Sequence, residues 1–231
     1  MFLRKATTVL REMGLLNGLL YGLARFLSDL SNGHAHLTRY KLVAQPISSR
    51  DVPLLRPSQK SQLRFVEDGD PLIAQFPRPA EVIARRFLDG QRCLTITSGE
   101  RFAGYLWITR NAYEEDEVRC RFELAEPQIA TWDSDVYVAP DFRHGRTFAR
   151  LWDAANQHLR SNGVRWSFSR ISAFNPHSLR SHSQFGTRHL GTATFLCLNS
   201  FQLMFASISP FVHVSLSRHA RPKLRLSPPA S

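Results

Sequence analysis

Cysteine is scarce in this sequence, and acidic residues are absent from its last third. The three cysteines, Cys93, Cys120 and Cys197, lie far apart, so a disulfide framework and a zinc knuckle are not expected, and a reducing compartment fits best. No apolar run is long enough to cross a bilayer. With 231 residues, 43% apolar and 21% charged, the chain is able to bury a sizeable core, which argues against wholesale disorder, collagen or a coiled-coil rod.

Charge is distributed unevenly along the chain. The net charge is +11, the last acidic residue is Asp153, and nine lysines and arginines follow it. A surface of one sign attracts anions such as phosphates, nucleic acid or acidic lipid. No nucleic-acid recognition motif accompanies these bases and aromatic residues are not interleaved with them, so a nucleic-acid binder is the least favoured function.

Residues 1–33 are predicted to form an N-terminal amphipathic helix. Leucine and phenylalanine recur at helical spacing from Leu16 to Leu30, after several basic residues. We expect the apolar face to dock on the chain's own domain. The alternative is peripheral contact of residues 1–30 with an anionic membrane. Asn17 and Arg25 interrupt the apolar run, which argues against a signal peptide, and the expected location is the cytoplasm or the inner face of the membrane.

The rest of the chain alternates between strand and helix patterns. Helices are expected over residues 79–88, 146–160 and 175–185, and strands over residues 36–47, 92–97, 102–109, 118–124, 129–138, 164–173, 188–198 and 202–208. The segment 48–62 is expected to be a loop. The basic tail 215–231, rich in proline and serine, is expected to be disordered. This order predicts one α/β (α+β) domain over residues 34–214, with a mixed, mostly antiparallel central sheet.

Residues 136–186 resemble a known superfamily. The segment Val136-Tyr-Val-Ala-Pro-Asp-Phe-Arg143 precedes a helix, Gly163-Val164 precedes a strand, and Asn175-Pro-His-Ser-Leu-Arg-Ser-His-Ser-Gln-Phe-Gly186 follows. In this order the segments resemble the acyl-CoA-binding half of the GNAT superfamily of N-acetyltransferases. The residues around Asn175 and the helical N-terminus are also similar to those of a subgroup associated with bacterial exosortase and exopolysaccharide loci. The resemblance implies a GNAT-like sheet with flanking helices and a splayed strand pair, residues 131–138 and 165–173.

The resemblance also implies a co-substrate, acetyl-CoA or another acyl-CoA. A helix N-terminus has unpaired N–H groups and the positive end of the dipole, which suit the phosphates of coenzyme A. The family pattern has small residues where this chain has Arg146 and Phe148, so that either the phosphates bind to arginine side chains or CoA binding is weak or lost. The implied cofactor-binding residues are Tyr137, Val138, Arg143, His144, Gly145, Arg146, Thr147 and Asn175.

Acyl transfer to an amine or hydroxyl by direct attack is the implied reaction, with a small-molecule or saccharide acceptor such as a surface-polymer precursor. His182 stands where the family has a tyrosine that protonates the thiolate, and the alternative is an ordinary helix-surface residue. Asp133 and Asp135 lie two apart on a strand and are expected to face one side as candidate general bases. The alternative is that they pair with arginines. A backbone N–H near Tyr137 or Val138 is implied to polarise the thioester carbonyl.

Two features narrow the remaining alternatives. Five histidines fall between His144 and His189, but their spacing matches no metal-ligand motif, and no metal is expected. The departures at Arg146 and Phe148 leave open a catalytically degenerate GNAT-like domain that serves as a binding or scaffold protein.

Overall fold

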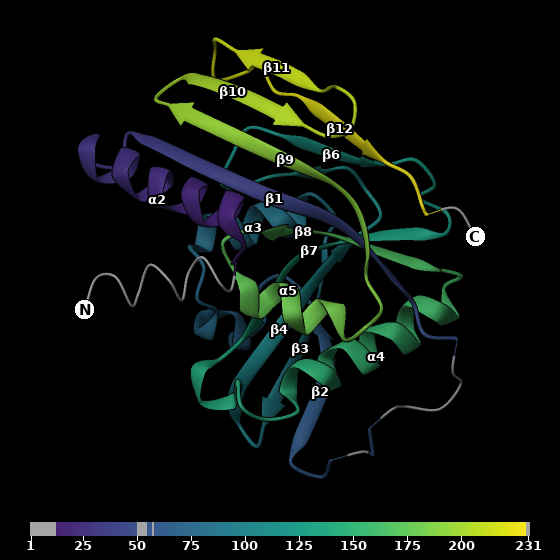
Figure 1. Ribbon diagram of the computed structural model, residues 1–231. Coiled ribbons are helices and arrows are strands. Elements are labelled where there is room, and N and C mark those ends of the chain that lie inside the picture. Colours follow the sequence, from purple (N-terminus) through teal and green to yellow (C-terminus); the bar gives the residue numbers. More distant parts are fainter. Residues whose placement is uncertain (1–12, 50–54, 57, 230–231) are drawn as a thin grey trace. The chain divides into compact units, whose positions relative to one another are not determined.

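The computed structural model describes residues 13–49, 55–56 and 58–229, which form two compact units. Unit 1 comprises Met1–Gln45, Tyr113–Ala125 and Ser169–Ser231, and unit 2 comprises Pro46–Ala112 and Glu126–Phe168. The described residues contain four α-helices, and most neighbouring strands pair in an antiparallel direction (Figure 1). The predicted mixed α/β class with a mostly antiparallel sheet and flanking helices is therefore confirmed.

Unit 2 contains one sheet and two α-helices. In chain order its elements are β2 (Ser61–Val66), a 3-10 turn (Pro71–Gln75), α3 (Ala80–Leu88), β3 (Arg92–Ser98), β4 (Arg101–Thr109), β7 (Ala130–Val138), a 3-10 turn (Pro140–Phe142), α4 (Thr147–Ser161) and the start of β8 (Trp166–Ser172). Within this unit the strands lie in the order β8-β7-β4-β3-β2, and only β7 and β8 are parallel. The predicted strands 92–97 and 102–109 correspond to β3 and β4, which pair as an antiparallel hairpin.

The sequence pattern explains how unit 2 packs. The apolar stripe predicted for α4 is buried, with Leu151, Trp152, Ala155 and Leu159 nearly inaccessible to solvent. A second cluster joins Ile83 of α3 to side chains of β2, β3 and β4. Gly104 lets β7 approach β4 closely, because a Cβ atom there would lie 2.4 Å from the Tyr137 carbonyl oxygen. The absence of this side chain therefore sets the position of β7.

Unit 1 contains a four-stranded sheet, a small three-stranded sheet and two α-helices. Its elements are α2 (Leu15–Leu30), β1 (Ala35–Pro46), β5 (Tyr113–Glu114), β6 (Arg121–Leu124), α5 (Pro176–Ser183), β9 (Arg188–Leu198), β10 (Phe201–Ala206), β11 (Val212–Ser215) and β12 (Lys223–Leu226). The larger sheet has the antiparallel order β11-β10-β9-β1. The smaller sheet has the order β12-β6-β5.

The expectation of a disordered tail is wrong. Residues 223–226 form β12, which pairs in parallel with β6. The alternation Lys-Leu-Arg-Leu places Leu224 and Leu226 in the interior while Lys223 and Arg225 stay exposed. The proline and serine residues around this segment led to the expectation of disorder. The segment is a strand because its two alternating leucines bury apolar surface.

The expected docking of the N-terminal helix is only partly realised. Residues 1–12 lie outside the described residues, and α2 contacts its own unit through Tyr21, whose ring lies 5.6 Å from that of Phe174. The opposite face carries large apolar side chains that are exposed: Leu15, Leu16, Leu19, Leu23, Phe26 and Leu30. In the part of the chain that the structure describes, no helix has the length and hydropathy to cross a membrane.

Candidate functional site

The loop between β7 and α4 holds most of the residues implied in coenzyme A binding. After Val138 the chain makes the 3-10 turn Pro140–Phe142 and enters α4 at Thr147. Residues 143–146 are exposed, whereas Thr147 is buried. The N-cap residue Arg146 makes no side-chain hydrogen bond to the helix, so its side chain leaves the first-turn N–H groups of α4 uncapped.

The cationic side chains of this loop divide into two groups. Arg143 turns back to β7, donating from Nε to the Val138 carbonyl at 3.0 Å, with its guanidinium 5.9 Å from the centre of the Tyr137 ring. His144 and Arg146 form no side-chain hydrogen bond or ion pair with any other described residue. Arg150, one turn into the helix, donates to the carbonyl of Arg56 at 2.9 Å. The loop therefore presents the guanidinium of Arg146 and the imidazole of His144, both without side-chain partners among the described residues, beside a helix N-terminus.

Gly145 does not need to be glycine for reasons of backbone shape. A Cβ atom there would meet the Phe142 carbonyl at an ordinary 3.5 Å, and its φ angle is not in the left-handed region. Phe148, at the second position that is small in the family, is half-buried in the first turn of α4. The loop thus has an ordinary conformation in spite of its departure from the family pattern.

Asp133 and Asp135 have different surroundings, contrary to the expectation that they face one side. The register of β4 and β7 shifts by one residue between them, because Asp133 pairs with Ile108 and Asp135 with Trp107. A bulge of this kind inserts one residue and breaks the alternation on which the expectation relied. Asp133 is buried and accepts a hydrogen bond from Ser167 Oγ at 2.9 Å.

Asp135 lies in a buried cluster of charges, which is the alternative that the sequence left open. Its carboxylate accepts from Arg78 at 2.8 and 3.0 Å, from Arg86 Nη1 at 2.9 Å and from the Tyr105 hydroxyl at 2.9 Å. Burial opposes ionisation, but the two arginines outweigh it and hold the pKa of Asp135 below its ordinary value. A carboxylate with four donors and a lowered pKa is a poor general base, so Asp135 is better suited to positioning.

Sequence reasoning missed the partners of Asp135. Arg86 lies in the last turn of α3 and is only 2% exposed, with its guanidinium 5.5 Å from the centre of the Trp107 ring. Arg78 precedes α3, and Tyr105 lies on the neighbouring strand β4. No sequence spacing links these residues to position 135; the one available signal was an arginine on the apolar side of a short helix.

Tyr137 and Val138 lie at the end of β7, as the resemblance implied. They pair with Tyr105 and Gly104 of β4, and the Tyr137 ring stacks on Phe102 with centroids 6.2 Å apart. Both residues are half-buried. The end of β7 is thus held by aromatic packing on one strand and by the hydrogen bond of Arg143.

His182 and Asn175 belong to unit 1. Asn175 is the N-cap of α5, because its side-chain oxygen accepts from the Ser178 N–H at 3.0 Å. His182 is 4% exposed, and burial lowers its pKa to about 4. At neutral pH the imidazole is therefore uncharged, and the imidazolium that the expected acid role requires is not present.

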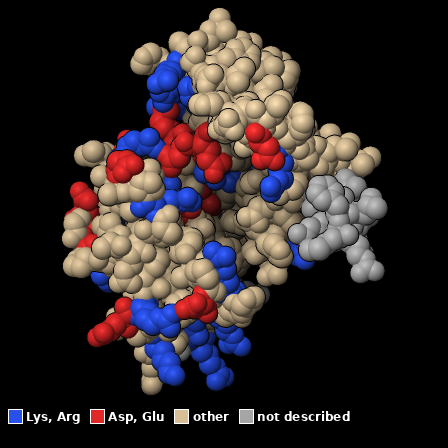
Figure 2. All heavy atoms as spheres, turned by 90° about the vertical axis from the view of Figure 1, so that its left-hand side faces the viewer, with Lys and Arg blue, Asp and Glu red and all other residues tan. Residues whose placement is uncertain are grey.

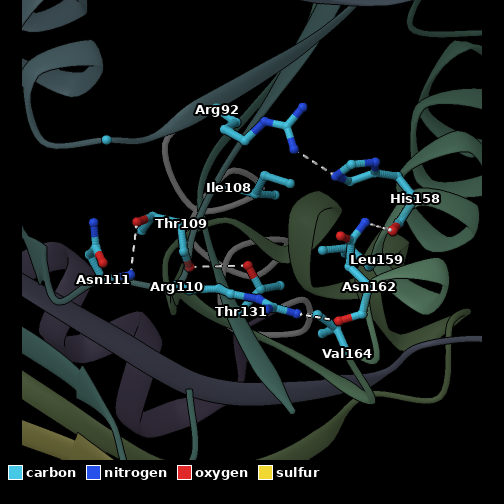
Figure 3. A pocket seen from close by; sticks show the side chains of 11 residues that line it. Arg92, Ile108, Thr109, Arg110, Asn111, Thr131, His158, Leu159, Asn162 and Val164 are labelled. Carbon is cyan, nitrogen blue, oxygen red and sulfur yellow. Dashed lines mark hydrogen bonds between the residues drawn. The ribbon is translucent and has the colours of Figure 1, made fainter. Parts of the chain in front are cut away.

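A pocket of about 260 Å³ lies at the other end of α4. Figure 3 shows Arg92 Nη1 at 3.0 Å from His158 Nε2, and Arg110 donating to the Asn162 carbonyl. These cations lie beside the C-terminus of α4, whose carbonyl groups and negative dipole end account for their presence. The helix has 15 residues and so separates this pocket from the loop 143–146 by about 20 Å.

Metal ligation was not expected from the sequence. Among the described residues, no three His, Cys, Asp or Glu side chains lie close enough together to hold a metal ion. The cysteines Cys93, Cys120 and Cys197 are buried and free, and burial raises the pKa of each thiol.

Comparisons with known proteins concern the fold. No protein-family model matches the sequence, and no curated protein matches it. Among solved structures, the chain is similar to a Drosophila protein at 12% identity and a TM-score of 0.50, over 78% of this chain and 59% of that one. A putative acetyltransferase of the GNAT family from Novosphingobium aromaticivorans matches at 16% identity and a TM-score of 0.48, over 69% and 63% of the two chains.

A third similar structure is smaller. It is an aminoglycoside acetyltransferase from an uncultured soil metagenomic sample, in complex with trehalose, at 13% identity and a TM-score of 0.41, over 55% of this chain and 87% of that one. The chain spans less than two thirds of the length of the other two structures. At these identities the likeness concerns the fold alone.

Proposed function

We propose that the protein is an acyltransferase of the GNAT type that moves an acetyl or longer acyl group from acyl-CoA to an amine or hydroxyl. The observation that carries the proposal is the end of β7, where the chain turns through Pro140–Phe142 into the uncapped N-terminus of α4. His144 and Arg146 lie there without partners among the described residues. Backbone N–H groups, the free guanidinium of Arg146 and the hydrogen-bonding imidazole of His144 together suit the pyrophosphate of coenzyme A.

The departure at Arg146 and Phe148 is consistent with this assignment. Small residues in the family let phosphate approach the backbone, whereas here the long side chains of Arg143 and Arg146 supply charged donors from the same loop. Arginine binds phosphate through two parallel N–H groups. In this loop, side-chain contacts would therefore replace the backbone contacts of the family. We therefore assign the phosphates to Arg143, His144, Arg146 and the amides of Gly145 and Thr147.

The acyl-bearing arm is assigned to β7. Within unit 2 this strand pairs with β8 over Ala130–Trp132, and we place the pantetheine arm along the residues that follow, as far as Val138. In the reaction the acceptor nitrogen or oxygen bonds to the thioester carbon, the C–S bond breaks, and the thiolate takes up a proton. An N–H group near Tyr137 or Val138 is our candidate for stabilising the carbonyl oxygen as it becomes negative.

The roles of the three titratable candidates differ. We keep Asp133 as the candidate acceptor of the proton from the attacking group, because it is a buried carboxylate of β7 that accepts a hydrogen bond from Ser167 Oγ. Asp135 is assigned to positioning β7 through Arg78 and Arg86. His182 is withdrawn as the acid, since its lowered pKa leaves it neutral. The acceptor is proposed to be a saccharide or other small molecule of the cytoplasm, on the resemblance to exopolysaccharide-associated proteins alone.

Calorimetry with acetyl-CoA tests the proposal. The wild-type protein should bind acetyl-CoA, and Arg143→Ala combined with Arg146→Ala should weaken binding by about tenfold or more, since a charge-assisted hydrogen bond contributes about 1.5–3 kcal/mol. Arg64→Ala is the matched control, because Arg64 is an exposed arginine of the same unit paired with Asp70. Absence of binding by the wild type, or an equal loss in the control, would contradict the proposal. Binding without turnover of any acceptor would indicate the degenerate alternative.

We also propose that α2 contacts an anionic membrane. Six exposed apolar side chains form a stripe on this helix, and Arg25 lies on the other face, one turn after Tyr21. Leu19→Ser combined with Leu23→Ser should reduce sedimentation with vesicles that contain phosphatidylglycerol. Leu88→Ser, at an exposed leucine of unit 2, should leave sedimentation unchanged.

A further inference from the structure

The larger sheet of unit 1 has one buried face of the usual apolar composition and one accessible face with an unusual composition. Along β9, β10 and β11 side chains alternate between buried and accessible positions. Phe195, Cys197 and Met204 point inward and are buried. In an antiparallel sheet with one packed face, the accessible positions are normally polar.

Here the accessible positions are largely apolar, and they lie side by side across the strands. Leu196 of β9 pairs with Leu203 of β10, which pairs with Val214 of β11. In the next row Phe205 pairs with Val212. We call the side chains of Leu198, Leu203, Phe205, Val212 and Val214 the outer sheet face; all but the half-buried Leu203 are about half exposed.

Negative charge is missing from this sheet. None of the strands β1, β9, β10 and β11 contains Asp or Glu, and no acidic residue follows Asp153 in the chain. Basic residues lie on the neighbouring strand β1. Arg39 pairs with Thr194, which itself pairs with Phe205, and Lys41 pairs with Thr192. Arg218 follows the exposed Leu216 beyond β11.

A view of the surface agrees with this composition. In Figure 2, which is turned about the vertical axis of Figure 1, much of the region that holds β9, β10 and β11 is free of Lys, Arg, Asp and Glu. The exposed side chains Leu198, Phe205, Val212 and Val214 make part of this uncharged region apolar. An exposed apolar patch on a folded protein marks an interaction site.

We propose that the outer sheet face binds the surface of an anionic lipid bilayer. Apolar side chains at half-exposed positions enter the interfacial region, and Arg39, Lys41 and Arg218 face the negatively charged headgroups. The proposal does not depend on acyl transfer. It adds to the contact proposed for α2 a second surface of the same unit, carried by different residues.

The charge pattern favours lipid over a second copy of the chain. A symmetric dimer through this face would be isologous, and it would bring the basic residues of both copies into one interface whose strands contain no carboxylate to pair with them. A dimer in which the edge strand β11 pairs with β11 of a second copy would also lack acidic groups at the interface. An anionic bilayer supplies the missing charge continuously along the face.

Vesicle sedimentation tests the proposal with the full chain. The wild type should sediment with vesicles of phosphatidylcholine mixed with phosphatidylglycerol and much less with phosphatidylcholine alone. Phe205→Ser combined with Val214→Ser should weaken binding by about tenfold, from the apolar area lost at the interface. Leu63→Ser combined with Leu88→Ser is the matched control, because these are exposed leucines of unit 2, and it should bind as the wild type does. Circular dichroism confirms that both variants are folded.

Each remaining outcome contradicts the inference in a distinct way. No sedimentation of the wild type, or equal weakening in the control, overturns it. Loss of sedimentation in the α2 variant but not in the Phe205 and Val214 variant overturns it while leaving the contact of α2 intact. If light scattering shows a wild-type dimer that the Phe205 and Val214 variant dissociates, the face is instead an interface between copies.

Discussion

The two units bury their charged groups in the same way but present different surfaces. In unit 2, Asp135 is held by Arg78, Arg86 and Tyr105. In unit 1, Glu115 is fully buried and paired with Arg170, and Tyr40 and Tyr113 lie beside the guanidinium. Each unit thus places a carboxylate with arginine and tyrosine in its interior.

The surfaces differ in apolar content. Among the described residues, unit 2 exposes only two large apolar side chains, Leu63 and Leu88, while all the others that are exposed belong to unit 1. Arg146, whose side chain has no partner among the described residues, lies in unit 2. The comparison teaches that this unpaired arginine and most of the exposed large apolar side chains lie in different units, so each feature is open to separate disruption.

The largest effect is expected from removal of a buried carboxylate. Asp135→Ala removes the carboxylate that accepts hydrogen bonds from Arg78, Arg86 and Tyr105, which should lower the free energy of unfolding by about 3–5 kcal/mol in urea denaturation. Asp141→Ala is the control, because Asp141 and Arg101 form an ion pair that is largely exposed, and it should be close to neutral. Equal effects of the two changes would show that the cluster of unit 2 is not a structural anchor.

Lowering the pH should reduce the stability of unit 1 because of His182. Its pKa is about 4 in the folded chain against an ordinary 6.5, so the unfolded chain binds a proton that the folded chain refuses. Stability therefore falls as the pH drops from about 6.5 to 4, by about 3 kcal/mol in all. His182→Gln should lose this part of the pH dependence in urea denaturation. The exposed His177→Gln should keep it, and identical acid profiles of the two variants would contradict the burial of His182.

Two glycines, Gly104 of β4 and Gly191 of β9, allow close contacts in the sheets of unit 2 and unit 1, and replacing each by alanine tests how tight these contacts are. A methyl group at Gly104 would lie 2.4 Å from a backbone oxygen, whereas at Gly191 it would meet side-chain atoms of Ser207 and Ile208 at 2.7 and 2.9 Å. Side chains move more easily than strands, so Gly104→Ala should destabilise by about 1–3 kcal/mol and Gly191→Ala by less. Thermal melting of both variants measures the difference. A larger loss at Gly191 would show that β7 has room to shift.

The smallest effect is expected at a helix cap. Asn175→Ala removes the hydrogen bond to the Ser178 N–H and should cost about 1 kcal/mol. Asn175→Asp keeps an accepting oxygen and should restore most of the stability. If the aspartate variant is as unstable as the alanine variant, Asn175 has a role other than capping.

Periodic patterns were sufficient to predict most of the fold. The strand β9 and the helix α4 match their expected ranges closely, because a long run of period two or 3.6 identifies an element and its buried face. Four short strands, β2, β5, β11 and β12, were not predicted. A strand of two to six residues has too few alternations to be recognised.

The candidate site was less predictable than the fold. The loop 143–146 and the cap at Asn175 could be found because caps and loops are local in sequence. The bulge that separates Asp133 from Asp135 and the arginines that clamp Asp135 depend on pairing between distant strands and a helix. Burial of His182 likewise follows from tertiary packing, which no local pattern of residues reports.

Hydrogen–deuterium exchange with and without coenzyme A tests the central claim most directly. The account predicts slower exchange of the amides of residues 139–149 when coenzyme A is added, because phosphates would accept hydrogen bonds from the first turn of α4. Exchange around Arg92 and Arg110, at the other end of the helix, should not change. Unchanged exchange in the loop at saturating coenzyme A, or protection confined to the far end of α4, would contradict the assignment of this loop as the acyl-CoA site.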